Sequence, residues 1–443
     1  MKRIISAIKE WEERELPELK ERQLDMNLFT KADHIIDIIG VRRSGKTYSM
    51  FLASKKLLKQ YNKQQIIYIN FENKALFPLN DKLLDKVLNY IIEKGLDKKK
   101  VFVFLDEVHN IKNWEKWARN IYDDYKGKIK LIVSGSTSKL IRKDVATLLT
   151  GRHLSNVLMP LSFKEFLFFN QMEYSKDDLL YSKKKQIEIK KQFKKYLEFG
   201  GFPEIVLTEN NELKLKILRN YYDDILYKDI VQHFKIKEMN ILENLTRFLI
   251  LNIGNYFSFK RVSDHLKSLN IKTSTRTLLR YTSMLEEVFL LHFVPIFSFK
   301  VKDELKYPRK IYLVDHSLKN VLNPDSDNFG SVAENIVFLE LKRQSLDKLF
   351  AINYWKSQAG EEIDFIIRKQ RKINELIQVC WDISSPETKK REIKALLKGS
   401  KELRCNNLLI ITGDYEAEEK VKGKKIKYIP LWKWLLSKAK TTL

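Results

Sequence analysis

Gly40-Val41-Arg42-Arg43-Ser44-Gly45-Lys46-Thr47 matches the pattern Gly-x-x-x-x-Gly-Lys-Ser/Thr in full. That pattern is typical of a phosphate-binding loop between a strand and a helix. Its glycines let the backbone wrap closely around phosphate oxygens, and the helix that follows offers free N–H donors and the positive end of its dipole. An apolar run precedes Gly40 and a helical pattern begins at Lys46, so the context also fits.

Two side chains of this loop have roles that follow from their chemistry. Lys46 can reach the β- and γ-phosphates of ATP, and Thr47 supplies a hydroxyl to Mg²⁺. The side chains of Arg42 and Arg43 occupy positions that usually point away from the phosphates. We expect ATP to contact Gly40, Val41, Arg42, Arg43, Ser44, Gly45, Lys46, Thr47 and Tyr48.

Short apolar runs alternate with helical patterns from about residue 30 to residue 160. The expected strands are His34–Ile39, Gln65–Asn70, Val101–Leu105 and Lys130–Ser134, and the expected helices are Lys46–Gln60, Leu83–Lys94 and Trp114–Tyr125. This alternation predicts an α/β fold in which helices cover both faces of a parallel sheet. Residues 1–30 are expected to form one charged helix, with Ile4, Ile5, Ile8 and Trp11 on one side.

Two adjacent acids, Asp106 and Glu107, follow the apolar strand pattern Val101-Phe-Val-Phe-Leu. An acid at this place holds Mg²⁺, so Asp106 is the expected metal partner together with Thr47, and Glu107 is the expected base for the attacking water. An acidic pair at a strand end can also be a turn or a helix N-cap. With a phosphate-binding loop upstream, the pair predicts hydrolysis as well as binding.

Polar residues after the next strand are candidates for sensing the γ-phosphate. Ser134 and Ser136 both fit, and the sequence does not choose between them; the alternative is a helix N-cap before Lys139-Leu-Ile-Arg142. Arg152 is the candidate arginine that neutralises transition-state charge, in its own subunit or in a neighbouring one. The alternative for Arg152 is an ordinary surface arginine.

Longer helical patterns follow Pro160. They cover Phe163–Phe169, Lys183–Glu198 and Leu213–Phe234, with a turn at Glu198-Phe-Gly-Gly-Phe-Pro203. Strand patterns return at Glu362–Ile367, Leu376–Trp381 and Asn407–Thr412, with a helix at Thr388–Leu397. We expect an ATPase domain at 1–160, a helical lid or linker at 161–238, a third domain at 239–329 and a small α/β domain at 330–443.

The third domain fits a winged helix-turn-helix. The helical patterns Phe257–Leu269 and Thr273–Glu287 are joined by a short turn and followed by a strand-like run. Lys272, Arg276 and Arg280 lie near the start of the second helix, where recognition helices place groups that reach DNA. A solvated helix with a Ser/Thr cap is the alternative, because many winged helices contact only proteins.

Composition narrows the class of partner. With 82 Lys+Arg against 57 Asp+Glu, the formal net charge of +25 favours a polyanion, and nucleic acid ranks before an anionic membrane surface. A lysine-rich solvated surface is the alternative. The two cysteines, Cys380 and Cys405, form neither a disulfide framework nor a zinc motif, which suggests a reducing cytoplasm. The apolar run Val288–Phe297 is about half of a membrane span, so no membrane association is expected.

Several stretches resemble archaeal and bacterial AAA-superfamily ATPases that carry a winged helix and a C-terminal nuclease-like domain of uncharacterised function. The matching stretches are Gly40–Thr47, Leu105–Trp114, Ser134–Ser136, Leu149–Arg152, Pro160–Phe166, Tyr196–Pro203, Tyr222–Asp229 and Lys310–Asp315. The resemblance implies an ATP/Mg²⁺ core, a winged helix at DNA, and assembly into homo-oligomers. It implies no cellular role.

The resemblance also implies a restriction-endonuclease-like site in the last domain. Such nucleases place a helical glutamate, a strand aspartate and a Glu-x-Lys around one Mg²⁺. Glu334 and Asp364 fit the first two positions, whereas Gln378-Val379-Cys380 lacks the acid and the lysine of the third. The remaining source of a positive charge in place of the missing lysine is the run Lys389, Lys390 and Arg391. We expect an inactive domain in which Glu334 and Asp364 are surface or capping residues.

Three functions remain open from the sequence. The first is an ATPase whose nucleotide state changes its assembly or its grip on DNA. The second is an ATP-gated switch that controls a protein partner. The third is an ATP-driven nuclease, against which Gln378 and Cys380 argue.

Overall fold

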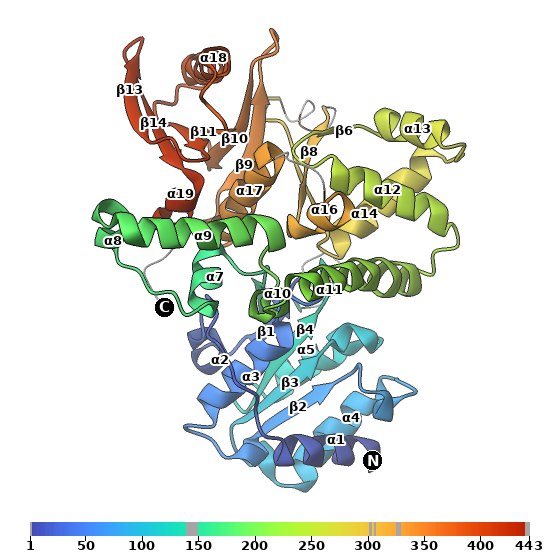
Figure 1. Cartoon of the computed structure of the whole chain (residues 1–443). Coiled ribbons are helices and arrows are strands. Elements are labelled where there is room, and N and C mark those ends of the chain that lie inside the picture. Colours follow the sequence, from blue (N-terminus) through green and yellow to red (C-terminus); the bar gives the residue numbers. More distant parts are fainter. Residues whose placement is uncertain (1, 139–148, 301–303, 305–306, 325–328, 439–443) are drawn as a thin grey trace. The chain divides into compact units, whose positions relative to one another are not determined.

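The computed structural model describes residues 2–138, 149–300, 304, 307–324 and 329–438 (Figure 1). Two compact units divide the chain: the first contains residues 2–158, and the second contains most of the residues from 159 on. The helix N-cap expected before Lys139–Arg142 lies outside the described residues. The division into four domains stays a prediction.

A five-stranded parallel sheet forms the centre of the first unit, in the order β2-β3-β4-β1-β5. Its strands are β1 (Ile35–Ile39), β2 (Ile66–Asn70), β3 (Val101–Asp106), β4 (Ile129–Gly135) and β5 (His153–Val157). The helices α3 (Lys46–Leu57), α4 (Lys82–Glu93) and α5 (Trp114–Asp124) flank it (Figure 1). Strands β1 and β3 are buried along their whole length, as continuous apolar runs predict. The predicted α/β fold is confirmed.

Strand β5 was not predicted, because its residues do not form an apolar run. It lies at the sheet edge and pairs with β1, with His153 opposite Ile35. Its polar side chains face a buried acid: Ser155 Oγ donates to Asp37 Oδ2 at 2.8 Å, and the His153 ring also bonds to this carboxylate. Burial raises the pKa of Asp37, and the hydrogen bond to that carboxylate raises the pKa of His153.

The N-terminal region is two helices, so the prediction of a single helix over residues 1–30 is wrong. Helix α1 (Lys2–Glu13) ends before Pro17, and α2 (Asn27–Lys31) begins much later. Proline disfavours helical backbone in the residue before it, which explains the early end. Ile4, Ile8 and Trp11 are buried, as the expected apolar side requires. Trp11 Nε1 donates to Ile66 O at 2.6 Å and so joins α1 to β2.

Helices dominate the first part of the second unit. They are α7 (Phe163–Phe169), α8 (Lys176–Tyr181), α9 (Lys183–Phe199), α10 (Pro203–Leu207), α11 (Asn211–Asp223), a π-helical segment (Asp224–Gln232), α12 (Met239–Leu251), α13 (Phe259–Ser268) and α14 (Thr275–Glu287). The helices predicted at Phe257–Leu269 and Thr273–Glu287 are present within two residues at each end.

Two sheets complete the second unit. The smaller one is antiparallel, in the order β6-β8-β7, from β6 (Tyr256–Phe257), β7 (Leu291–Val294) and β8 (Arg309–Leu313). The larger one is mixed, in the order β13-β14-β12-β11-β10-β9, from β9 (Ala351–Lys356), β10 (Glu362–Lys369), β11 (Lys372–Cys380), β12 (Leu408–Thr412), β13 (Ala417–Val421) and β14 (Lys424–Pro430). Helices α16 (Ser317–Leu322), α17 (Phe329–Lys348), α18 (Pro386–Glu402) and α19 (Leu431–Lys438) accompany them. No helix in the described ranges is both long and apolar enough to cross a membrane.

A Gly-Gly turn lies between α9 and α10, where the sequence predicted a turn. Gly200 has φ +71° and ψ −157°, a region that is almost closed to other residues. A Cβ atom at Gly200 would lie 1.9 Å from Asp315 Oδ1. The Asp315 carboxylate also accepts a hydrogen bond from Gly201 N at 2.8 Å, so it is fixed in place.

We therefore expect Gly200→Ala to lower the free energy of unfolding by roughly 2–5 kcal/mol, from backbone strain and overpacking together. Gly423→Ala is the matched control, because Gly423 has φ +78° but no atom within 4 Å of the added Cβ. It should cost about 1–2 kcal/mol. Urea unfolding of both variants measures the difference, and equal losses would show that Asp315 yields without cost.

Candidate functional site

The loop from Gly40 to Gly45 joins β1 to α3 at the carboxyl edge of the first sheet. A Cβ atom at Gly40 would lie 2.1 Å from Leu158 O, so only glycine fits there. Gly45 and Arg43 have φ values of +96° and +68°, and this left-handed backbone curls the loop over the first turn of α3. Helix α3 begins at Lys46, and its first N–H groups face the loop.

Lys46 is 5 % exposed and lies against its own loop. Its Nζ is 3.2 Å from Gly40 O, 3.3 Å from Val41 O and 3.4 Å from Glu107 Oε1. The ammonium is thus held between the loop backbone and the acid that follows β3.

Asp106 is fully buried at the end of β3 and accepts hydrogen bonds from three hydroxyl groups. Thr47 Oγ1 and Tyr68 OH each lie 2.7 Å from its Oδ2, and Ser134 Oγ bonds to its Oδ1. Burial raises the pKa of Asp106, and the charge of Glu107 raises it further. The three hydroxyl groups therefore offset the negative charge of Asp106 only in part. A carboxylate in such an environment is stabilised by a nearby cation.

Glu107 has left-handed backbone, with φ +51°, which turns the chain sharply after β3. Its N–H donates to Ser134 Oγ at 2.9 Å. Besides Lys46, its carboxylate faces His109, whose Nδ1 is 3.3 Å from Oε2. The turn therefore places the Glu107 carboxylate beside Lys46 and His109.

Ser134 and Ser136 are placed differently. Ser134 joins the Asp106 carboxylate to the Glu107 backbone, whereas Ser136 Oγ is buried without a hydrogen-bonding partner among the described residues. Of the two sensor candidates, Ser134 is therefore the one in contact with the acids. Tyr68 and His109 also belong to this group, and no motif in the sequence marked them.

Two arginine side chains near the loop, those of Arg42 and Arg22, form hydrogen bonds with different segments. Arg42 donates to Glu72 Oε1 at 2.9 Å, so its side chain is directed to the segment after β2. Arg22, which was not predicted, is 9 % exposed, and its Nη1 donates to Ser44 O in the loop at 2.8 Å. The N-terminal segment thus supports the loop backbone.

Arg152 does not join the other candidate residues. It precedes β5 at the amino edge of the sheet, where its carbonyl accepts from Ile35 N at 2.8 Å, and the loop lies at the opposite end of β1. Its guanidinium pairs with Asp123, with Nε 2.7 Å from Oδ1. Arg152 therefore does not contact the loop of its own chain, and both an action on a neighbouring subunit and an ordinary surface arginine stay predictions.

Residues 32–167 match an AAA domain, as predicted. The residues after it match two domains of unknown function, DUF8612 over 190–328 and DUF4143 over 329–434. The uncharacterized protein MJ1544 of Methanocaldococcus jannaschii is 36% identical over 407 residues, which cover 90% of this chain and 88% of that protein. The chain belongs to the same family as MJ1544. An uncharacterized protein of Haemophilus influenzae is 28% identical, over 91% of this chain and 95% of its own length.

Solved structures with partial similarity include Cdc6p from Pyrobaculum aerophilum and RuvB from Thermotoga maritima. The first is 13% identical with a TM-score of 0.29, over 74% of this chain and 96% of its own. The second is 15% identical with a TM-score of 0.28, over 62% and 87%.

The second group of predicted residues lies in the C-terminal sheet, and the prediction that Glu334 and Asp364 are surface or capping residues is wrong. Asp364 is 7 % exposed, and both carboxylates bond to Lys310 Nζ from β8, at 2.9 and 2.8 Å. Burial raises the pKa of Glu334 to about 7 against the opposing charge of Lys310. Gln378 instead bonds to Glu392, and the Cys380 thiol donates to Asp382 O at 3.2 Å.

The basic residues near that sheet do not fill the third position either. Lys389 pairs with Glu419, and Arg391 pairs with Glu392 at 2.7 Å. The positive charge beside Glu334 and Asp364 therefore does not come from the predicted run Lys389, Lys390 and Arg391. It comes from Lys310 on β8, a strand that the sequence did not connect with this domain.

We expect Arg22→Ala to lower the free energy of unfolding of the first unit by about 1.5–3 kcal/mol, because the Ser44 carbonyl loses a charged donor in a buried place. The control is Lys59→Ala, at an exposed position of the same unit, which should stay within about 0.5 kcal/mol of the unchanged protein. Chemical unfolding followed by tryptophan fluorescence measures both. A loss for Arg22→Ala no larger than the control's would contradict the support of the loop by Arg22.

Proposed function

We propose that this protein binds ATP with Mg²⁺ in its AAA domain and hydrolyses it. The observation that carries the proposal is the convergence of Lys46, Thr47, Asp106 and Glu107 at the carboxyl edge of one parallel sheet. Phosphoryl transfer needs a positively charged side chain at the phosphates, ligands for the metal and a group that orients water, and these residue types provide all three. The match of residues 32–167 to an AAA domain supports it.

The triphosphate would lie along the loop and the start of α3. Backbone N–H groups from Gly40 to Thr47 supply donors, and the helix dipole favours the negative charge. Lys46 then exchanges the loop carbonyls and Glu107 for β- and γ-phosphate oxygens. Because it is already held beside the loop, little side-chain entropy is lost on binding.

Thr47 Oγ1 and the Asp106 carboxylate are suited to Mg²⁺, which prefers hard oxygen ligands and retains several waters. Their 2.7 Å contact brings both oxygens to one place, and Tyr68 and Ser134 orient the carboxylate from behind. The bound ion would neutralise charge on the β- and γ-phosphates during transfer.

Glu107 is the residue that we propose to polarise the attacking water. Its left-handed backbone and its bond to Ser134 aim the carboxylate towards Lys46, where the γ-phosphate would lie. When phosphate replaces the carboxylate beside Lys46, Glu107 is released to accept a proton from water. Arg152 would act on the site of a neighbouring subunit in a homo-oligomer, since the paired Asp123 lies on the surface with it.

Two substitutions separate binding from hydrolysis. Lys46→Ala should weaken ATP binding by about 10–100-fold, because a charge-assisted contact to phosphate is lost. Glu107→Gln should keep ATP affinity within a factor of about three, yet lower kcat by roughly 100-fold or more. Fluorescent-nucleotide titration and a phosphate-release assay measure the two quantities. Hydrolysis by Glu107→Gln at the unchanged rate would refute the assignment of the base.

We further propose that the ATPase acts at DNA. Helices α13 and α14, followed by the antiparallel strands β7 and β8, have the element order of a winged helix. Lys272, Arg276 and Arg280 are exposed around the Ser274 cap of α14, whose Oγ accepts from Thr277 N at 3.1 Å. The cap fits the alternative of a solvated helix as well, so the exposed charges are what favour DNA.

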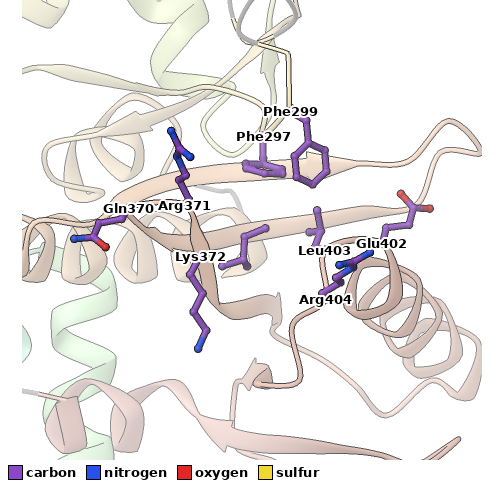
Figure 2. Close-up of a pocket in the computed structure, with 9 residues that line it drawn as sticks. Phe297, Phe299, Gln370, Arg371, Lys372, Glu402, Leu403 and Arg404 are labelled. Carbon is purple, nitrogen blue, oxygen red and sulfur yellow. The ribbon is translucent and has the colours of Figure 1, made fainter.

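A second basic surface supports the same partner. A pocket of about 910 Å³ is lined by residues that include Phe297, Phe299, Arg371, Lys372 and Arg404, and Figure 2 shows these side chains. The rings of Phe297 and Phe299 lie 5.1 Å apart; Phe299 is 81 % exposed, whereas Phe297 is only 7 % exposed. An exposed ring beside basic groups favours unpaired bases and their phosphates.

Contact through α14 predicts a measurable salt effect. Arg276→Ala combined with Arg280→Ala should reduce by about 2 the slope of log affinity for duplex DNA against log salt. The control, Lys191→Ala with Lys216→Ala, removes the same charge from exposed positions of α9 and α11 and should leave the slope nearly unchanged. Equal slopes for both pairs, or an ATPase rate that DNA does not raise, would favour an ATP-gated switch for a protein partner.

A further inference from the structure

One lysine stands among three carboxylates in the second unit. Lys310 Nζ, on β8, is 2.9 Å from Glu334 Oε1 on α17, 2.6 Å from Glu362 Oε1 and 2.8 Å from Asp364 Oδ1 on β10. The Lys310 side chain is only 2 % exposed. An ammonium has three N–H donors, and each has one carboxylate here. We call these four residues the Lys310 cluster.

Other donors fix the three carboxylates in place. Tyr312 OH donates to Glu334 Oε1 at 2.7 Å, Tyr256 OH donates to Glu362, and Val379 N donates to Asp364 Oδ2 at 2.9 Å. Glu362 and Asp364 each use one oxygen for Lys310 and the other for the second donor, whereas Glu334 Oε1 accepts from both Lys310 and Tyr312.

The three carboxylates come from two elements, the helix α17 and the strand β10. We propose that the ε-ammonium of Lys310 takes the place of a divalent cation at this site, so that the protein's own side chain is the resident cation. The missing Glu-x-Lys at Gln378-Val379-Cys380 fits this, because an internal cation needs neither the third ligand nor a lysine for water.

Charge and distance both favour the lysine over a metal in the protein as it stands. Three buried carboxylates without a cation are strongly unfavourable, and Lys310 offsets one charge by direct hydrogen bonds. The 2.6–2.9 Å contacts are hydrogen-bond lengths, whereas Mg²⁺ requires about six oxygens at roughly 2.1 Å.

The cluster also joins two segments that match different family models. Lys310 lies within residues 190–328, and its three partners lie within 329–434. An ammonium in place of a metal therefore ties β8 to α17 and β10 without dependence on metal supply. The proposed role of the site is to hold these elements together.

The test is to remove the internal cation and offer an external one. Without added metal, Lys310→Ala and Lys310→Met should both unfold at a lower temperature than the unchanged full-length chain, because the carboxylates lose their counter-charge. Saturating Mn²⁺ should raise the Tm of Lys310→Ala by roughly 5 °C or more. Lys310→Met is the matched control, because it fills the same space without charge and should gain much less.

All three proteins share the same ATPase site, so metal bound there without nucleotide cancels in the comparison. Electron paramagnetic resonance should count one more bound Mn²⁺ per chain in Lys310→Ala than in the unchanged protein. If Lys310→Ala does not fold alone, its refolding yield with and without Mn²⁺ gives the same answer, and recovery only with Mn²⁺ supports the proposal.

Two results would overturn it. A Mn²⁺ shift in the unchanged protein that Asp364→Asn abolishes would mean that a metal binds beside Lys310. Mn²⁺-dependent DNA cleavage that Asp364→Asn abolishes would mean the same. No Mn²⁺ response in Lys310→Ala, by Tm, spin count or refolding, would mean that these carboxylates do not form a cation site.

Discussion

The carboxylate of Asp106 has no access to solvent, and three hydroxyl groups from three different elements point at it. Thr47 begins α3, Tyr68 lies in β2 and Ser134 in β4, so this single group fixes the helix after the loop relative to three strands of the sheet. Its burial leaves negative charge that the hydroxyl dipoles offset only in part. In the function proposed above, the desolvation that makes the carboxylate costly to bury would also favour a cation beside it. Burial of the two Asp106 carboxylate oxygens therefore lowers the stability of the fold, a cost that is common at sites that bind a ligand.

The sequence predicted the parts of the fold that local pattern controls. Continuous apolar strands, amphipathic helices between them and the glycine-rich loop have signals that extend over a few residues, and the α/β sheet followed from them. Strand β5 gave no such signal, since its polar side chains are explained only by the buried Asp37 on the neighbouring strand. Pro17 did mark the early end of α1, but the charged, weakly periodic segment after it concealed the break.

The candidate site also contains residues that local sequence patterns predict and residues that they do not. Lys46, Thr47, Asp106 and Glu107 lie in motifs, so their identity and their proximity were predictable. Tyr68 and Arg22 were not, because each reaches the loop region from a distant stretch through tertiary packing alone. Lys310 is the extreme case: it lies 24 residues from Glu334 and 54 from Asp364, in a segment with no apparent link to the last domain. For Arg152 the sequence left open whether it acts in its own subunit or in a neighbouring one, and strand direction places it at the opposite end of β1 from the loop.

The close contact between Gly40 and Leu158 restricts how the backbone can move. Leu158 N donates to Ile39 O at 2.7 Å, and the Leu158 carbonyl occupies the space where any side chain at position 40 would stand. The backbone on each side of this contact cannot shift alone without breaking a hydrogen bond or creating a collision. Leu158 is also the last residue of the first unit before the chain enters the second. A hydrogen bond and a steric contact therefore hold the loop against the residue at which the chain leaves the first unit, so neither segment shifts without the other.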